Sequence, residues 1–252
     1  DLIERRKLRL ERGPGYVRMS WVFDTLVWKD EKGYVPGLAR TWSFDPKSLS
    51  FAFELHPKAK WHDGRPVTAD DVVFTIAYFK KHPYGWISLD HVDRGEARGE
   101  HTVVLVLSKP YAPFMSDIAG TMPILPRHIW EKVDQPQAFD APEAFIGSGP
   151  YRFKDFNKAQ GTYLYEAFAD HHLGRPKAER VIYVRSGKPL VSLSTGEVDL
   201  ANIQPEMAEP LRQKGMTVIQ DERGWVKKLM INHKKPPFDD RRFRRALAYG
   251  IN

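Results

Sequence analysis

Histidine and aspartate side chains offer the first candidate chemistry in this chain, because imidazole and carboxylate groups both ligate transition metals. His171 and His172 are adjacent, and His56, His62 and Asp63 lie near one another in the sequence. Neighbouring side chains on an extended chain point to opposite sides, and neither set is accompanied by residues that would orient the rings. We therefore interpret these residues as surface histidines in turns, and we expect no metal site and no cofactor.

The sequence contains no strong motif for nucleophilic or acid–base catalysis. The chain has no G-x-S-x-G, no P-loop, no H-E-x-x-H and no EF-hand loop. The paired carboxylates at 70–71 and 239–240 stand at predicted helix starts, where capping explains them. Aspartate, serine and histidine are all present, but nothing in the sequence places them together as a triad. We predict that the chain is not an enzyme and has no catalytic residue. Turnover in an activity screen would revive the alternative hypothesis that it is a hydrolase.

A short glycine-rich turn at 147–149 has some likeness to a phosphate-binding loop. Pro150 follows it at once and removes a backbone N–H donor, and no third glycine comes at the spacing that a dinucleotide loop needs. We therefore exclude a nucleotide site at this turn.

Aromatic residues are the informative excess, with 7 Trp, 10 Tyr and 14 Phe. Tyr84, Trp86 and Trp225 fall in or beside predicted turns that contain glycine. An aromatic ring is usually part of the core, but exposed rings beside glycine are also typical of a binding cleft. The sequence leaves both interpretations open.

Composition limits the class of protein. The 252 residues carry a net charge of +7, with 39 Lys and Arg against 32 Asp and Glu, and no cysteine, which excludes disulfides and thiolate sites. The two densest basic clusters, at 5–12 and 241–245, have acidic residues beside them, so we interpret them as solvated helix faces and expect no nucleic-acid partner. No apolar run is long enough to span a membrane, and the charged residues at the start of this sequence do not predict a signal peptide.

The first half of the chain alternates short strands and helices. The segment 21–28 is apolar and predicts a helix or a strand. Alternating apolar residues predict strands at 51–55 and 103–107. Thr68 and the acids after it predict a helix start, and a short helix follows at 113–118.

The second half, after the turn at 147–149, also predicts strands and helices in alternation. The expected strands are 151–156, 162–167, 181–185, 198–203, 216–220 and 225–232. The expected helices are 189–195, 206–214 and one that Asp240 caps. This last helix continues to Asn252 without a stop signal, so we expect the chain to be cut from a longer one.

The segment 35–74 resembles the family 5 extracellular solute-binding proteins, which are the peptide-, dipeptide- and nickel-binding receptors of ABC importers. The most specific match is the run WHDGRPVTADDVVF at 61–74. Further matches follow in family order at 124–129, 147–151, 194–199 and 232 with 236–248. Together the matches cover nearly the whole chain from about Trp21 onward.

The resemblance implies an α/β, periplasmic-binding-protein-like (class II) lobe with a mixed sheet and an inserted α+β subdomain. By motif position, residues 1–41 plus 149–252 would form the first ligand-binding lobe, which would be incomplete. Residues 42–148 would form the inserted subdomain, with a core of its own. The family's opening strand is not recognisable in 1–15, and the family continues well past Asn252, so the second lobe is expected outside this chain.

The resemblance also implies binding without turnover. A small peptide or similar solute would sit between the lobes, and a membrane-embedded ABC permease would recognise the closed form. The protein would be periplasmic, or extracellular and membrane-anchored. As an alternative, the same fold could serve as the ligand-sensing module of a regulatory protein, with the basic stretch 5–12 as a linker.

Motif position assigns the expected ligand contacts. Asp24 and Asn232 match first-lobe positions near the ligand, and Tyr84 with Trp86 matches a loop that reaches over the cleft. The alternatives are a helix cap for Asp24, a strand-end turn for Asn232, and packing against a sheet for the two aromatic residues. We expect these residues and Trp225 to face one concavity.

Substitution of Trp225 tests this expectation. Gly224 permits close backbone approach, and a tryptophan at a strand mouth offers a rigid face and one N–H donor. We expect Trp225→Ala to lower ligand affinity in the full-length parent at least roughly thirtyfold, about 2 kcal/mol or more, while the fold survives. Titration calorimetry with the cognate ligand measures this change. An unchanged affinity would favour the alternative that Trp225 packs in the core and does not contact the ligand.

Overall fold

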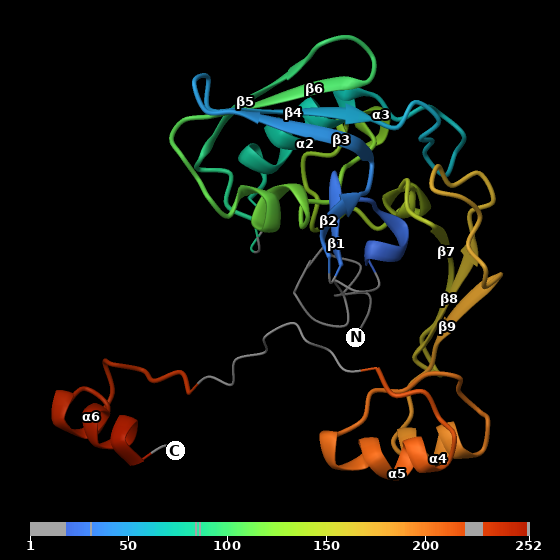
Figure 1. Ribbon diagram of the computed structural model, residues 1–252, viewed down its shortest axis with the longest axis vertical. Coiled ribbons are helices and arrows are strands. Elements are labelled where there is room, and N and C mark those ends of the chain that lie inside the picture. The colour runs from blue at the N-terminus through green and yellow to red at the C-terminus, as the bar shows by residue number, and fades with distance from the viewer. Residues whose placement is uncertain (1–18, 31, 84, 86, 220–228, 251–252) are drawn as a thin grey trace. The chain divides into compact units, whose positions relative to one another are not determined.

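The computed structural model describes residues 19–30, 32–83, 85, 87–219 and 229–250 (Figure 1). The chain divides into two compact units between Arg185 and Ser186. Tyr84, Trp86 and Trp225 lie outside the described residues. Among the described residues, no helix combines the length and the apolar character that a membrane crossing requires.

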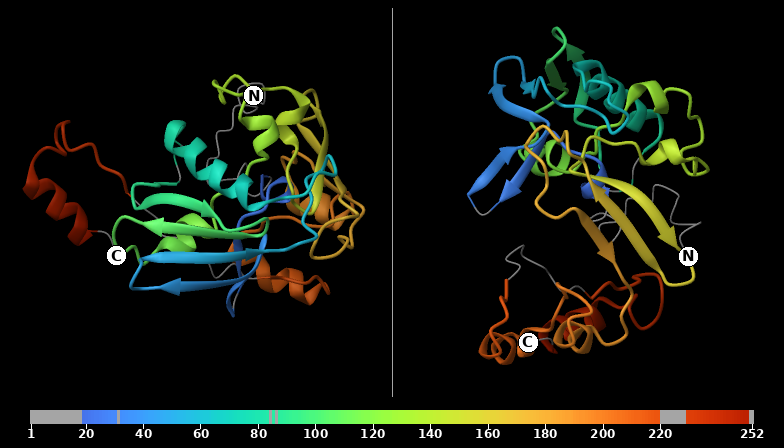
Figure 2. Two further views of the ribbon diagram at one scale, coloured as in Figure 1. Left: turned by 90° about the horizontal axis from the view of Figure 1, so that it is seen from above. Right: turned by 90° about the vertical axis from the view of Figure 1, so that its right-hand side faces the viewer.

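A four-stranded antiparallel sheet forms the first layer of the first unit. Its strand order is β3-β4-β6-β5. The strands are β3 (Ala39–Asp45), β4 (Ser50–Leu55), β5 (Val92–Ala97) and β6 (Thr102–Leu107). The structure thus confirms the strands predicted at 51–55 and 103–107. Helix α2 (Ala69–Lys81) packs against this sheet along β5 and β6 and buries its apolar stripe there (Figures 1 and 2).

The start of α2 is fixed as the sequence predicts. Thr68 is the N-cap and forms a capping box with Asp71, whose carboxylate accepts the Thr68 backbone N–H at 2.9 Å. The other oxygen of Asp71 accepts the backbone N–H of Arg127 at 2.9 Å, at the start of α3 (Arg127–Trp130). One buried carboxylate therefore orders the beginnings of two helices.

The segment predicted as helix or strand at 21–28 contains both. Residues 19–22 are helical, and β1 (Val27–Asp30) then pairs with β2 (Gly33–Pro36) in an antiparallel hairpin. Farther along the chain, η1 (Met115–Ala119) confirms the short helix predicted near 113–118. A single 3₁₀ turn, η2 (Pro142–Phe145), precedes the glycine-rich turn.

A three-stranded antiparallel sheet follows in the order β7-β8-β9. Its strands are β7 (Tyr151–Asn157), β8 (Thr162–Ala167) and β9 (Arg180–Tyr183), which confirms the strand pair predicted at 151–167. Trp21 packs edge-on against Tyr151, with ring centroids 5.1 Å apart, and its indole N–H donates to the Tyr183 hydroxyl at 2.7 Å. The helical residues 19–22 are thereby fastened to this sheet.

The turn at 147–149 packs backbone against backbone on residues 21–22. The Gly149 N–H donates to the Val22 carbonyl at 2.8 Å. A Cβ on Gly149 would lie 2.6 Å from the Trp21 carbonyl oxygen, and one on Gly147 would overlap the Val22 carbonyl outright. Glycine is needed here for close approach, not for a phosphate.

His62 lies under this turn, and both of its ring nitrogens are bonded to it. The Nε2–H donates to the Gly149 carbonyl at 2.9 Å, and Nδ1 accepts the Gly147 N–H at 3.3 Å. This arrangement requires the neutral imidazole, because a protonated Nδ1 could not accept. Burial lowers the pKa of His62 from 6.5 to about 4. The expectation of a surface histidine is wrong for His62, because the turn covers the ring.

The second unit is built from short helices. They are α4 (Pro189–Ser194), η3 (Pro205–Met207), α5 (Ala208–Gln213) and α6 (Arg241–Gly250). The Arg242 N–H donates to the Asp240 carboxylate at 2.7 Å, which confirms the predicted cap. Among the described residues of this unit, Leu211 is the one buried apolar side chain.

Three predicted strands in the second unit are wrong in the part that the structure describes. Residues 198–203, 216–219 and 229–232 are irregular. A strand needs a hydrogen-bonded neighbour and a core to cover, and these segments have neither among the described residues. Alternation of apolar and polar side chains alone is not enough to make these segments strands.

The predicted domain division remains a prediction. The strands of the segment 39–107 form one sheet and the strands of 151–183 form another. The boundary expected at 41–42 falls inside β3. Every described strand pair is antiparallel, so the mixed sheet implied by the resemblance is not among the described sheets.

Gly147→Ala tests the close backbone packing. We expect the free energy of unfolding to fall by more than about 2 kcal/mol, because the new methyl group would overlap the Val22 carbonyl. Urea denaturation followed by tryptophan fluorescence measures this change. Gly85→Ala is the matched control, since a Cβ there meets open space. Equal stability of the two variants would show that the turn is not closely packed.

His62 predicts a pH dependence of stability. Its pKa is about 4 in the folded state against 6.5 for an exposed ring, so the unfolded state binds the proton more readily. The contribution is therefore complete above pH 6.5 and is lost as the pH falls toward 4, by about 3 kcal/mol in total. In urea denaturation, His62→Gln should flatten the stability profile between pH 7 and 4.5. His233→Gln, at an exposed ring, should keep the parental slope; parallel profiles for His62→Gln and the parent would contradict the prediction.

Candidate functional site

The structure describes two of the five residues that the sequence assigns to a ligand. Asp24 belongs to the first unit, and its side chain is 13% exposed. Asn232 belongs to the second unit and is exposed. Tyr84, Trp86 and Trp225 lie outside the described residues, so their roles stay predictions.

The backbone around Asp24 is pinned to neighbouring segments. The Asp24 carbonyl accepts the Ile124 N–H at 3.0 Å. The next two carbonyls, of Thr25 and Leu26, accept N–H groups from the segment that leads into β3 at 3.0 and 2.9 Å. These bonds fix the position of the Asp24 backbone.

His171 and His172 lie in a turn shortly after β8. The turn begins where the Phe168 N–H donates to the Pro150 carbonyl at 2.8 Å, and the His171 N–H then donates to the Phe168 carbonyl at 3.2 Å. The ring centroids of His171 and His172 are 4.4 Å apart, and their side chains are only 7% and 1% exposed. The expectation that they are surface residues pointing to opposite sides is wrong, because the chain turns here instead of extending.

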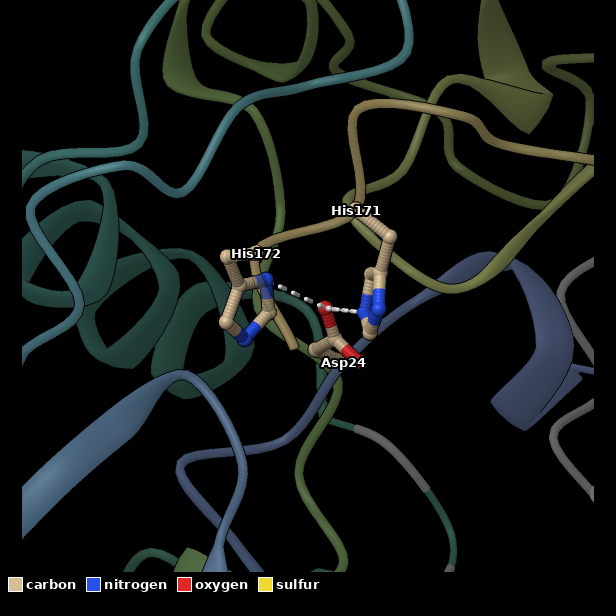
Figure 3. Close-up of side chains that lie close together, drawn as sticks. All are labelled: Asp24, His171 and His172. Carbon is tan, nitrogen blue, oxygen red and sulfur yellow. Dashed lines mark ion pairs between the residues drawn. The ribbon is translucent and has the colours of Figure 1, made fainter. Parts of the chain in front are cut away.

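The two rings stand on either side of the Asp24 carboxylate (Figure 3). The Oδ2 atom of Asp24 lies 3.6 Å from His171 Nε2 and 4.0 Å from His172 Nδ1. All three atoms lie within 4.8 Å of one another. No local pattern in the sequence predicts this group, since Asp24 and the histidines are far apart along the chain.

A further imidazole ring, that of His56, lies beside this group. The ring centroid of His56 is 5.2 Å from that of His172. Burial is the main cause that lowers the pKa of His172, and the nearby Asp24 carboxylate and the bond to Gly37 oppose it. Burial and then the charge of Arg40 lower the pKa of His56. The rings of His56 and His172 therefore favour the neutral form, which has a free lone pair.

Asn232 forms a turn in the described part of the second unit. Its side-chain oxygen accepts the Lys234 N–H at 3.0 Å, and its carbonyl accepts the Lys235 N–H at 3.2 Å. The turn was one of the two roles that the sequence left open for Asn232. A role in ligand binding remains untested and stays a prediction.

The histidine–aspartate group can hold a cation or a proton between its rings and its carboxylate. Among the described residues it is the one group of three or more histidine and acidic side chains whose ligand atoms converge.

Comparison with known proteins places the chain in a family. The family profile described as bacterial extracellular solute-binding proteins, family 5 Middle, matches residues 33–252. A putative ABC transporter peptide-binding protein of Brucella ovis is 27% identical over 252 residues, covering 94% of this chain and 47% of that protein. The dipeptide-binding protein of Escherichia coli is 26% identical over 247 residues, covering 86% of this chain and 46% of that protein.

A solved structure gives the same result for the fold. The mannohexaose-bound periplasmic oligopeptide-binding protein of an oligopeptide ABC transporter from Thermotoga maritima is similar with a TM-score of 0.77 and 28% identity. The match covers 92% of this chain and 46% of that chain. It confirms the predicted α/β, periplasmic-binding-protein-like fold. The chain spans about half the length of the curated relatives it matches, and it belongs to the bacterial extracellular solute-binding proteins of family 5.

Proposed function

We propose that this chain is part of an extracytoplasmic receptor that binds a peptide or a related small solute and delivers it to a membrane-embedded ABC permease. The observation that carries the proposal is the family match over residues 33–252. The relatives compared above support it, because one is named as a dipeptide-binding protein and another as a peptide-binding protein of an ABC transporter. The function is binding without chemical turnover.

The choice of a receptor over a regulatory sensor rests on the same relatives. Their names describe binding proteins, and one of the solved structures is a periplasmic protein of a transporter. That structure holds an oligosaccharide although the protein is named for oligopeptides. We therefore propose the ligand class as a peptide or a related small solute and leave its side-chain preference to experiment.

The proposal assigns solute contacts residue by residue. Asp24 offers a carboxylate to a cationic or N–H group, and the Asn232 amide can donate to and accept from a peptide backbone. Tyr84, Trp86 and Trp225 offer aromatic faces against which an extended solute can lie. Backbone bonding in this manner gives affinity without strict sequence preference.

Asn232→Ala in the full-length protein tests the assignment in the second unit. We expect the variant to bind the solute about tenfold more weakly than the parent, since it loses roughly one hydrogen bond to a desolvated solute backbone. Titration calorimetry against defined di-, tri- and longer peptides provides the measurement.

Asn157→Ala is the matched control. The Asn157 side chain also accepts a backbone N–H in an exposed turn, from Gln160 at 3.0 Å, so the variant loses a similar turn bond. It should bind the solute like the parent. Equal losses of affinity in both variants would show that Asn232 has only a structural role in its turn. A parent protein that binds none of the peptides would contradict the proposed ligand class. Release of cleaved peptide would contradict binding without turnover.

A further inference from the structure

We infer that Asp24, His171 and His172 bind a divalent first-row transition-metal ion, with Zn²⁺ as the reference ion. The site lies wholly within the first unit. It shares Asp24 with the solute contacts proposed above, but its test uses the metal ion without any solute. The metal would be a resident ion that joins two segments of the fold, with water in its remaining coordination positions.

Three buried polar atoms converge without partners. Asp24 Oδ2, His171 Nε2 and His172 Nδ1 are all buried, and none has a hydrogen-bond partner among the residues that the structure describes. Buried polar atoms in proteins are nearly always satisfied, and an exception calls for a bound water or ion. A single metal ion would satisfy all three atoms at once.

The hydrogen bond to Gly37 shows which ring nitrogen of His172 carries the hydrogen. The other nitrogen then presents its lone pair to Asp24. The Nε2 atom of His172 lies 3.0 Å from the Gly37 carbonyl oxygen, which can only accept, so Nε2 carries the hydrogen. In the neutral ring, Nδ1 then presents a lone pair to Asp24 Oδ2 across 4.0 Å. Two acceptors that face each other in a buried space repel, and a cation between them turns this repulsion into attraction.

The spacing of the three atoms fits an ion after a small contraction. The Oδ2 atom of Asp24 lies 3.6 and 4.0 Å from the two nitrogens, and all three separations are within 4.8 Å. Ligand atoms on a tetrahedral Zn²⁺ ion are about 3.4 Å apart for bonds of about 2.0–2.1 Å. An approach of roughly half an ångström per atom closes the difference, which side-chain rotation can supply.

The types of ligand atom select the class of metal. Two imidazole nitrogens and one carboxylate oxygen suit Zn²⁺, Ni²⁺, Co²⁺ or Cu²⁺, whereas Ca²⁺ and Mg²⁺ prefer sites made of oxygen alone. The chain has no cysteine, so no thiolate competes for such an ion. The ring of His56, with its centroid 5.2 Å from that of His172, offers a further imidazole beside the group.

The surroundings orient the ligands as metal sites usually require. A metal-binding histidine commonly donates its second N–H to a carbonyl, and His172 does so to Gly37. Gly37 is itself held tightly, because a Cβ there would lie 2.6 Å from the Thr25 carbonyl oxygen. The residue after Asp24 therefore positions the carbonyl that orients His172.

Metal binding would fasten the segment before β1 to the turn after β8. These segments are distant in the sequence, so an ion shared between them stabilises the folded state by mass action. From the sequence alone, no metal is expected at His171 and His172, because adjacent side chains on an extended chain diverge and no supporting partners are evident. The turn and the Gly37 carbonyl supply what that expectation lacked.

Titration of the full chain with Zn²⁺ alone tests the inference. The protein is stripped with a chelator, dialysed and titrated in a calorimeter, without any solute. We expect one ion per chain, and we expect no signal with Mg²⁺ at the same concentration. His171→Gln and His172→Gln should each weaken Zn²⁺ binding at least about tenfold. Zn²⁺ should also raise the melting temperature of the parent but not of the two variants.

His128→Gln is the matched control. His128 Nε2 lies 2.7 Å from Asp63 Oδ2, so the variant removes a histidine–aspartate pair that is not part of a larger ligand group among the described residues. It should bind Zn²⁺ like the parent. If the parent does not bind Zn²⁺, or if His171→Gln and His172→Gln bind it as tightly as the control, the group is an ion pair and the inference is wrong.

Two further measurements keep the outcome unambiguous. Far-UV circular dichroism checks that each variant is folded, and His171→Gln, at the more exposed of the two rings, decides the matter if His172→Gln does not fold. Peptide titration of the full-length protein is carried out separately. Absent Zn²⁺ binding with intact peptide binding overturns the metal site alone, and the reverse result overturns the proposed ligand class alone.

Discussion

The contact between the glycine turn at 147–149 and the helical residues 21–22 joins segments that are far apart in the chain. Gly149 donates to the Val22 carbonyl, and neither Gly147 nor Gly149 has room for a side chain. The His62 ring packs against this contact and forms one hydrogen bond to each of the two glycines. Only a neutral ring can form both bonds. A close approach of this kind excludes water and leaves no freedom to shift.

The histidine–aspartate group inherits its geometry from that contact. Asp24 follows Val22 by two residues, so its position is set where the helical segment meets the turn. Pro150 follows Gly149, and its carbonyl accepts the N–H of Phe168, from which the chain turns to His171 and His172. The ring of His62 packs edge-on against Phe168, with centroids 5.0 Å apart. One backbone packing contact therefore brings both sides of the group together.

The two units differ in the size of their apolar cores. The first has a continuous apolar core in which Trp61, Phe114 and Trp130 are fully buried. The described part of the second buries one apolar side chain, and it exposes Leu200, Ile219 and Met230. Asn232 therefore sits on a turn held by local bonds, whereas Asp24 sits on backbone that is bonded to core segments.

Local patterns in the sequence correctly predicted several elements and the family. The capping pair Thr68 and Asp71, the alternation at 51–55 and the run at 61–74 depend on neighbours in the chain, so they could be predicted without a fold. The strands expected at 198–203 and 216–219 failed, because a strand depends on a partner that the local pattern does not specify. The meeting of Asp24 with His171 and His172 was likewise decided only by the tertiary structure, since it follows from long-range backbone packing that no local periodicity encodes.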